Sequence, residues 1–90
     1  MEANVHIVVE GLVQGVGFRW YVARKAQVMG LAGYVRNLYD GNVEIEAEGD
    51  RSLLEELIGD VKVGPRSAQV TNLRIEWQEP RRDATHFEIR

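Results

Sequence analysis

Residues suited to binding an anion gather near the start of the chain, in the segment 11–19, which reads Gly-Leu-Val-Gln-Gly-Val-Gly-Phe-Arg. Gly15 and Gly17 allow a positive φ and let the backbone approach a ligand without a Cβ in the way. A helix-like run begins near Phe18, and a helix N-terminus exposes free N–H groups and partial positive charge. Arg19 adds a planar, permanently charged fork that matches phosphate or carboxylate oxygens. The segment predicts a cradle for an oxyanion or a phosphate group.

A purely structural interpretation of this segment stays open on these residues alone. Gly15 and Gly17 could form only a tight turn, and Arg19 could be an ordinary surface side chain. The segment is not a Walker loop, which needs Gly-Lys-Ser/Thr, and it lacks the third glycine of a dinucleotide fingerprint. A second segment, residues 30–41, favours the anion-binding interpretation over the purely structural one.

Two extended motifs stand at a defined separation in the chain. They read Gly11-x-Val13-Gln14-Gly15-Val16-x-Phe18-Arg19 and Gly30-Leu31-x-Gly33-Tyr34-Val35-Arg36-Asn37-x-x-Asp40-Gly41. Together they closely resemble the motifs of the acylphosphatase family, and the likeness in spacing, length and element order covers nearly the whole chain. Tyr34 stands where tryptophan is more usual, and Leu12 and Gly17 stand where the family varies. We expect these departures to alter packing and not chemistry.

The resemblance implies hydrolysis of a small acylphosphate to a carboxylate and inorganic phosphate, without a cofactor or a metal. A carboxylate leaves without strong protonation, so the reaction mainly needs a held phosphoryl group and a water aligned with the breaking bond. Phosphate binding is predicted for Gln14, Gly15, Val16, Gly17, Phe18 and Arg19. Asn37, whose amide can donate and accept hydrogen bonds, is predicted to position the water. In acylphosphatases the matching arginine and asparagine have these catalytic roles, and the substrate's own phosphate assists water deprotonation.

Two other functions fit part of the pattern. A catalytically idle phosphate-binding or regulatory domain would share the loop, as do the acylphosphatase-type segments of hydrogenase-maturation carbamoyltransferases, but the presence of both Arg19 and Asn37 favours an enzyme. A ferredoxin-like RNA-binding module would need aromatic side chains on an exposed sheet face for base stacking. That face instead carries glutamates, at positions 44, 46 and 48.

Composition narrows the class of protein further. Ninety residues predict one domain, residues 1–90, and 14 acidic against 11 basic residues give a net charge of −3, which argues against nucleic-acid partners. The chain has no cysteine, which excludes disulfides, zinc–thiolate sites and thiol nucleophiles. No apolar run is long enough for a membrane helix, and the first residues do not resemble a secretory signal. We expect a cytoplasmic monomer without membrane contact.

The elements that must position the two motifs follow from hydrophobic periodicity. Strands are predicted at 5–9, 32–38, 43–48 and 68–77, and helices at 18–29 and from about residue 50 or 52 to Gly64. A short last strand follows a turn at 79–83, with Phe87 and Ile89 facing inward. This order is that of an α+β, ferredoxin-like βαββαβ fold, with two helices on one face of an antiparallel sheet and a short extra C-terminal strand. Its topology brings the ends of the first two strands, and thus the Gln14–Arg19 loop and Asn37, to one edge.

Several local features carry their own predictions. Gly30 is placed to end the first helix in a left-handed conformation, and Ser52 with Glu55 matches a capping box for the second. Val70 differs in parity from Leu73, which suggests a bulge in the fourth long strand. The last strand would carry Arg90 toward the edge that holds the two motifs.

The remaining polar and aromatic residues have mostly structural interpretations. The glutamates at 44, 46 and 48 are expected on an exposed strand face, paired with arginines of neighbouring strands. Those partners are expected to be Arg36 and Arg74, and His6 and His86 are expected at the surface. Trp20 and Tyr21 could shape the rim of a substrate site, and Trp77 is expected in the core.

Overall fold

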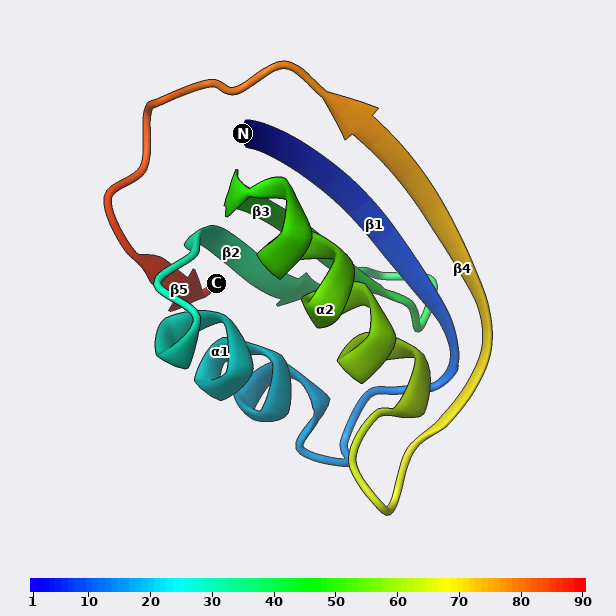
Figure 1. Ribbon diagram of the computed structural model, residues 1–90. Coiled ribbons are helices and arrows are strands. Elements are labelled where there is room, and N and C mark those ends of the chain that lie inside the picture. The colour runs from blue at the N-terminus through cyan, green and yellow to red at the C-terminus, as the bar shows by residue number, and fades with distance from the viewer.

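Alternating apolar residues build a sheet that two helices cover on one face, as Figure 1 shows for the computed structural model of residues 1–90. The elements are β1 (Glu2–Leu12), α1 (Phe18–Val28), β2 (Ala32–Asn37), β3 (Val43–Asp50), α2 (Arg51–Val63), β4 (Gln69–Gln78) and β5 (Phe87–Ile89). The α+β, ferredoxin-like fold with a short extra C-terminal strand is therefore confirmed. No helix has the length and apolarity needed to cross a bilayer.

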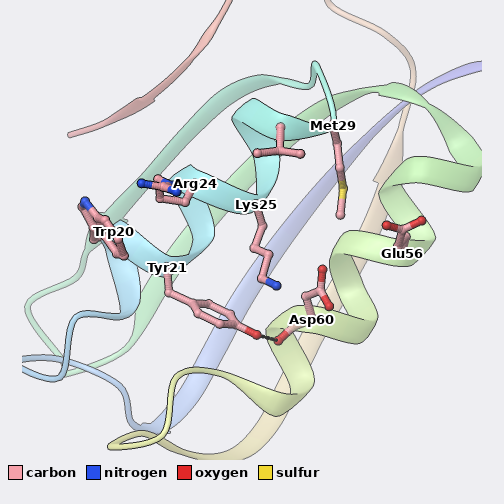
Figure 2. A pocket seen from close by; sticks show the side chains of 8 residues that line it. Trp20, Tyr21, Arg24, Lys25, Met29, Glu56 and Asp60 are labelled. Carbon is pink, nitrogen blue, oxygen red and sulfur yellow. Dashed lines mark hydrogen bonds between the residues drawn. The ribbon is translucent and has the colours of Figure 1, made fainter.

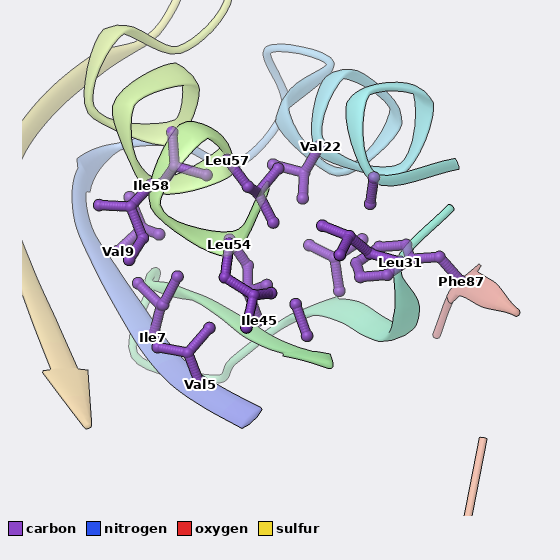
Figure 3. Packing of buried hydrophobic residues seen from close by; sticks show 14 of the residues in the cluster. Val5, Ile7, Val9, Val22, Leu31, Ile45, Leu54, Leu57, Ile58 and Phe87 are labelled. Carbon is purple, nitrogen blue, oxygen red and sulfur yellow. The ribbon is translucent and has the colours of Figure 1, made fainter. Parts of the chain in front are cut away.

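The core lies between the sheet and the two helices. Strand β1 contributes the fully buried Val5, Ile7 and Val9, and α2 contributes its buried stripe of Leu54, Leu57, Ile58 and Val61 (Figure 3). Helix α2 packs on β1 and β3, whereas α1 packs on β2 and β5. The period of two in the strands and of 3.6 in the helices gives each element one apolar face, and burying these faces is the main source of stability.

The strand order is β4-β1-β3-β2-β5, and the last strand makes the sheet mixed. The first four strands pair antiparallel as predicted, but β5 pairs parallel to β2, with Phe87 opposite Gly33 and Ile89 opposite Val35. Strand β4 runs antiparallel to β1, so the chain that returns from it runs in the direction of β1 and β2. Figure 1 shows the connecting segment passing from β4 at one edge to β5 at the other.

Two of the local predictions are confirmed. Helix α1 ends at Val28, and Gly30 then takes a left-handed φ of 71°. The bulge lies in β4, where Glu10 faces Asn72 but the next residue, Gly11, faces Val70. A Cβ at Gly11 would lie 2.1 Å from the Gln69 carbonyl oxygen, so glycine permits this close approach.

The predicted capping box does not form. Helix α2 begins at Arg51, with Asp50 and not Ser52 as its N-cap, and without a side-chain capping hydrogen bond. The Ser52 hydroxyl donates to the Asp50 carboxylate, which also accepts from the N-terminal ammonium at 2.9 Å. These two partners lower the pKa of Asp50 to about 2. Ser52 is therefore engaged by the residue before the helix.

The glutamates on the open face of the sheet are less exposed than the alternation of β3 predicts. Glu44 and Glu46 have side chains only 13% and 15% exposed. Segment 79–86 contacts this face: the backbone N–H groups of Arg81 and Arg82 donate to the Glu48 carboxylate at 2.6 and 2.9 Å, and the Arg81 guanidinium lies 3.5 Å from Glu46. We call this segment the strap. Its contacts are with Glu46 and Glu48, whereas Glu44 pairs with residues of the sheet itself.

The ion pairs on this face follow the strand order. Arg36 pairs with Glu44 at 2.5 Å as predicted, and His6 lies 2.8 Å from the same carboxylate. Arg74 does not reach the β3 glutamates and pairs with Glu10 at 2.9 Å instead, because β1 lies between β4 and β3. His6 is thus a partner of Glu44 and not an isolated surface residue.

Two apolar residues near the sheet edges, Trp77 and Ile89, are less buried than predicted. Trp77 is only half-buried; it packs against the core, with the Arg51 guanidinium 3.9 Å from its ring centroid. Phe87 faces inward as predicted, whereas Ile89 is 45% exposed.

Candidate functional site

The loop between β1 and α1 turns its backbone toward one cavity. Gly15 and Gly17 have φ of 73° and 79°, while Val16 between them has a negative φ. Such alternation directs successive N–H groups to the same side and forms an anion-binding concavity. A Cβ at either glycine would meet no atom within 4 Å, so glycine is needed there for its conformation and not for space.

The N-terminus of α1 is left without an internal partner. Gly17 is its N-cap, no side chain caps it, and its first turn contains no acidic residue. The first helical hydrogen bond runs from the Tyr21 N–H to the Gly17 carbonyl at 3.0 Å. The N–H groups of Phe18, Arg19 and Trp20 therefore stay free, and together with the helix dipole they favour a negative charge.

The Arg19 side chain is exposed and takes part in no ion pair. Arg36, Arg74 and Arg90, by contrast, each pair with a glutamate within 3 Å. A guanidinium has five donors in a rigid fork, and these donors bind two oxygens of one carboxylate or phosphate. Arg19 is therefore free to bind an anion from solution.

Asn37, the last residue of β2, has a buried side-chain oxygen without a partner. Its Oδ1 is one of only three buried side-chain polar atoms that make no hydrogen bond, the others belonging to Asn4 and Gln78. Buried polar atoms are nearly always paired, so an orphan needs an explanation. Of the three residues, only Asn37 lines the cavity beside Arg19, and a water or a ligand there would supply the missing donor.

The site cavity joins these groups in about 210 Å³. Its lining residues are Val13, Gly15, Gly17, Phe18, Arg19, Trp20, Asn37 and Ile89. The structure thus brings Arg19 and Asn37 to one place, as the topology predicts, together with three of the predicted loop residues. Phe18 contributes from the backbone, since its ring is buried in the core.

Gln14 and Val16 do not line the cavity. The Gln14 side chain reaches behind the loop, where its Nε2 donates to the carbonyl oxygens of Leu38 and Asn42, both at 2.8 Å. Both of its N–H donors are therefore engaged by the turn that follows Asn37. Gln14 holds the loop to the β2–β3 turn, and Val16 packs against the core.

Ile89 is the site residue that sequence reasoning missed. Its side chain was expected in the core, because alternation places it on the same face as Phe87. The signal that could have found it is the parallel pairing of β5 with β2, which sets Ile89 beside Val35 and close to Asn37. That pairing depends on the path of the strap, and no pattern in the sequence predicts it.

A second, larger hollow of about 520 Å³ lies between the two helices (Figure 2). Tyr21 points into it and donates its hydroxyl hydrogen to the Asp60 carbonyl oxygen at 2.9 Å; burial, followed by the charge of Asp60, raises the Tyr21 pKa. Lys25 faces it from α1, and Glu56 and Asp60 face it from α2. The cation thus shares this hollow with two carboxylates, whereas no acidic residue lines the site cavity. Of the predicted rim, only Trp20 reaches the site cavity.

Arg19 is the only charged residue among those that line the site cavity. Nowhere do three or more His, Cys, Asp or Glu side chains gather into a set that could hold a metal ion. Arg90 does not line the cavity: its guanidinium lies 4.3 Å from the Tyr34 ring centroid and pairs with Glu88 at 2.6 Å. Arg19 and the backbone N–H groups are thus the cationic and donor groups available there.

Known proteins resemble this chain in both fold and sequence. The acylphosphatase family model matches residues 5–89. An acylphosphatase from Chlorobaculum tepidum is 46% identical over 98% of this chain and 96% of its own length. The crystal structure of acylphosphatase from Bacillus subtilis superposes with a TM-score of 0.93 at 38% identity, covering 99% and 98% of the two chains.

A larger protein contains a similar unit. The crystal structure of T. kodakarensis HypF matches with a TM-score of 0.83 and 36% identity, over 100% of this chain but 12% of that one. The family match nevertheless spans almost every residue here, and the matches to the Chlorobaculum and Bacillus relatives cover nearly the whole of both chains. The chain therefore belongs to the acylphosphatase family.

Proposed function

We propose that this chain hydrolyses small acylphosphates by direct attack of water on phosphorus, with Arg19 and the loop amides holding the phosphoryl group and Asn37 positioning the water. Family membership makes the chain an acylphosphatase, with a small-molecule acylphosphate as substrate and phosphate as product. The observation that supports the mechanism is one cavity that holds an unpaired guanidinium, free backbone N–H groups and an orphaned amide oxygen.

The phosphoryl oxygens are the natural occupants of the cradle. The dianionic end of the substrate meets the fork of Arg19 and the N–H groups of the loop and of the first turn of α1. These donors are fixed by the backbone, so little reorganisation is needed as charge develops on the equatorial oxygens. Two oxygens would bind the guanidinium while the third binds the amides, which leaves the acyl group pointing out of the cradle.

Asn37 supplies a hydrogen-bond acceptor to the same cavity, whereas Arg19 and the loop supply donors. Its unpaired Oδ1 accepts a hydrogen bond from water and turns the water's lone pair toward phosphorus. The new bond forms between the water oxygen and phosphorus while the bond from phosphorus to the bridging oxygen breaks. The carboxylate leaves with that electron pair, and both water protons remain on the phosphate as H₂PO₄⁻. In-line geometry, and not a general acid, supplies most of the rate.

A catalytically idle anion-binding domain is the second candidate, because a similar unit occurs within HypF. Such a domain would need the cradle but would have no use for the unpaired oxygen of Asn37. The two candidates differ in turnover and not in affinity. Both predict that inorganic phosphate binds to the loop.

The test is hydrolysis of benzoyl phosphate by the wild-type chain, with and without EDTA. We expect turnover in both conditions, since no ligand set for a metal is present, and we expect inorganic phosphate to inhibit competitively. Turnover that disappears in EDTA and returns with a divalent cation would contradict the mechanism. Phosphate binding without any turnover would favour the idle domain. The cytoplasmic location, the monomeric state and the absence of nucleic-acid or membrane partners remain predictions from composition.

A further inference from the structure

Two apolar side chains beside the anion-binding groups are exposed, and the mechanism does not use them. Trp20 is 61% exposed and Ile89 is 45% exposed, and both line the site cavity. The other apolar residues of that cavity, Val13 and Phe18, are buried and belong to the core. Large apolar side chains in a cavity with a few convergent polar groups are typical of a surface that contacts the apolar part of a ligand.

The two apolar residues come from different elements. Trp20 follows Arg19 in the first turn of α1, and Ile89 is the last residue of β5. Because Ile89 pairs with Val35, it lies on the strand next to Asn37. Each polar group of the cavity therefore has an apolar neighbour, one on the helix and one on the sheet edge.

We propose that Trp20 and Ile89 form an acyl-binding rim that contacts the organic group of the substrate and favours large apolar acyl groups over acetyl. The inference rests on the proposed function, since it requires the phosphoryl group to lie against Arg19 and the loop. An acylphosphate has one charged end and one end that is only as polar as its acyl group. Once the charged end occupies the cradle, the acyl end meets the remaining lining side chains, and apart from Asn37 these are apolar.

Arg24 restrains the aromatic half of the rim. Its guanidinium carbon lies 5.0 Å from the centroid of the Trp20 ring, within the range of a cation–π contact. Figure 2 shows Trp20 and Arg24 together on one side of α1, while Tyr21 and Asp60 join on the side that faces α2. A restrained ring loses less conformational freedom when it stacks on a ligand, so the contact increases the selectivity that Trp20 provides.

The rim is partly open to water, which sets the size of the effect. A methylene group in an enclosed apolar pocket discriminates between substrates by about 10- to 200-fold, and a half-exposed surface should fall near or below the lower limit. The discrimination should appear in kcat/KM for substrates that differ only in the acyl group. It should not depend on how well the phosphoryl group is held.

The experiment compares benzoyl phosphate with acetyl phosphate as substrates of the full chain. We measure the ratio of their kcat/KM values in wild type, Trp20→Ala, Trp20→Phe and Ile89→Ala. The control is Ile75→Ala, because Ile75 is 40% exposed, similar to Ile89, but lies on β4 and does not line the site cavity. All three rim substitutions affect side chains that are largely outside the core, so folding should be preserved, as thermal unfolding will verify.

We expect Trp20→Ala to lower the benzoyl-to-acetyl ratio about tenfold and Ile89→Ala about threefold, with Trp20→Phe and Ile75→Ala close to wild type. A ratio that stays within about twofold of wild type in both alanine variants would overturn the rim, as would an equal loss on both substrates. Failure of the underlying mechanism is distinguishable, because Arg19→Lys would then retain near-normal activity on acetyl phosphate whatever the ratio.

Discussion

Replacing Arg19 by lysine keeps a positive charge in the cavity but removes the planar fork that binds two oxygens at once. The free loop N–H groups cannot compensate, because they are already assigned to the third oxygen. We expect Arg19→Lys to lower kcat/KM for benzoyl phosphate by about 10³-fold or more, as for other arginines that act on transferring phosphoryl groups. Steady-state kinetics on the folded variant provide the measurement.

The choice of control matters for this experiment. Arg24 lies on the same helix, but its contact with the Trp20 ring links it to the cavity. Arg66 is exposed and makes no ion pair, so Arg66→Lys is the cleaner control and should change kcat/KM little. If the two variants lost similar small factors, Arg19 would be an ordinary solvated charge.

Asn37 makes a different prediction, because its oxygen has no partner in the protein. Asn37→Ala removes an unsatisfied polar atom and no hydrogen bond of that oxygen, so we expect a melting temperature close to wild type. Turnover should fall by about 10²–10³-fold, the usual loss for one oriented polar group. The KM should change much less than kcat. A variant with near-normal kcat would show that another group orients the water.

Gln14 shows how one side chain connects two elements. Its two hydrogen bonds join the β1–α1 loop to the backbone after Asn37. The Gln14→Ala change should reduce the free energy of unfolding by about 1–3 kcal/mol, from two net hydrogen bonds. It should also lower kcat, because Arg19 and Asn37 would no longer be held at a fixed separation.

The control for this prediction is Gln69→Ala, since the Gln69 side chain is exposed and makes no hydrogen bond. Urea denaturation and benzoyl phosphate kinetics would be measured on both variants. A Gln14→Ala variant that matched wild type in kcat, even though it was less stable, would mean that the loop keeps its geometry without this connection.

At the level of elements, the sequence predicts what depends on local conformation and on strand alternation. The end of α1 at Gly30 and the bulge near Val70 both follow from residue type and parity, and both are present. The errors arise where the local structure depends on contacts with residues far away in the sequence. Ser52 turns back to Asp50, and Asp50 also binds the N-terminal ammonium. The pattern of residues 50–55 gives no sign of that second partner, which comes from the start of the chain.

The same limit explains the site. Arg19 and Asn37 could be predicted to meet because βαββαβ topology brings the ends of β1 and β2 to one edge. Ile89 could not, since its place depends on which strand β5 joins. That choice is made by the strap, a segment of irregular backbone with no hydrophobic period to read.

For the whole molecule, the strap is the connection that joins the two edge strands, β4 and β5. The Glu48 carboxylate accepts hydrogen bonds from the Asn4 side chain at 2.9 Å and from two strap N–H groups. Arg82, one of the two strap donors, has a φ of 57°, which is unusual for a residue other than glycine. These bonds position the strap and therefore β5, which carries Ile89 to the cavity. A single carboxylate on β3 thus influences the far edge of the sheet.

Acid should loosen this connection. Burial alone would raise the pKa of Glu48, but the hydrogen bonds from Asn4, Arg81 and Arg82 outweigh it and hold the pKa below its ordinary value of 4.5. The same holds for Glu44, where burial is outweighed by hydrogen bonds from His6 and Arg36. The unfolded chain binds protons at these carboxyls at a higher pH than the folded chain does. Their contribution to stability is therefore complete above pH 4.5 and is lost as the pH falls through the lowered folded-state pKa values.

Glu48→Gln tests this account, because an amide presents one acceptor oxygen and an N–H group that opposes the strap donors. We expect the variant to lose about 1–3 kcal/mol of unfolding free energy at pH 7, and the difference from wild type to shrink as the pH falls below about 4. Urea denaturation between pH 3 and 7 provides both curves. Glu79→Gln is the control, since Glu79 is exposed and pairs with no residue, and its curve should follow that of wild type. A Glu48→Gln curve that ran parallel to wild type at every pH would mean that the strap is held by other contacts and that acid acts elsewhere in the molecule.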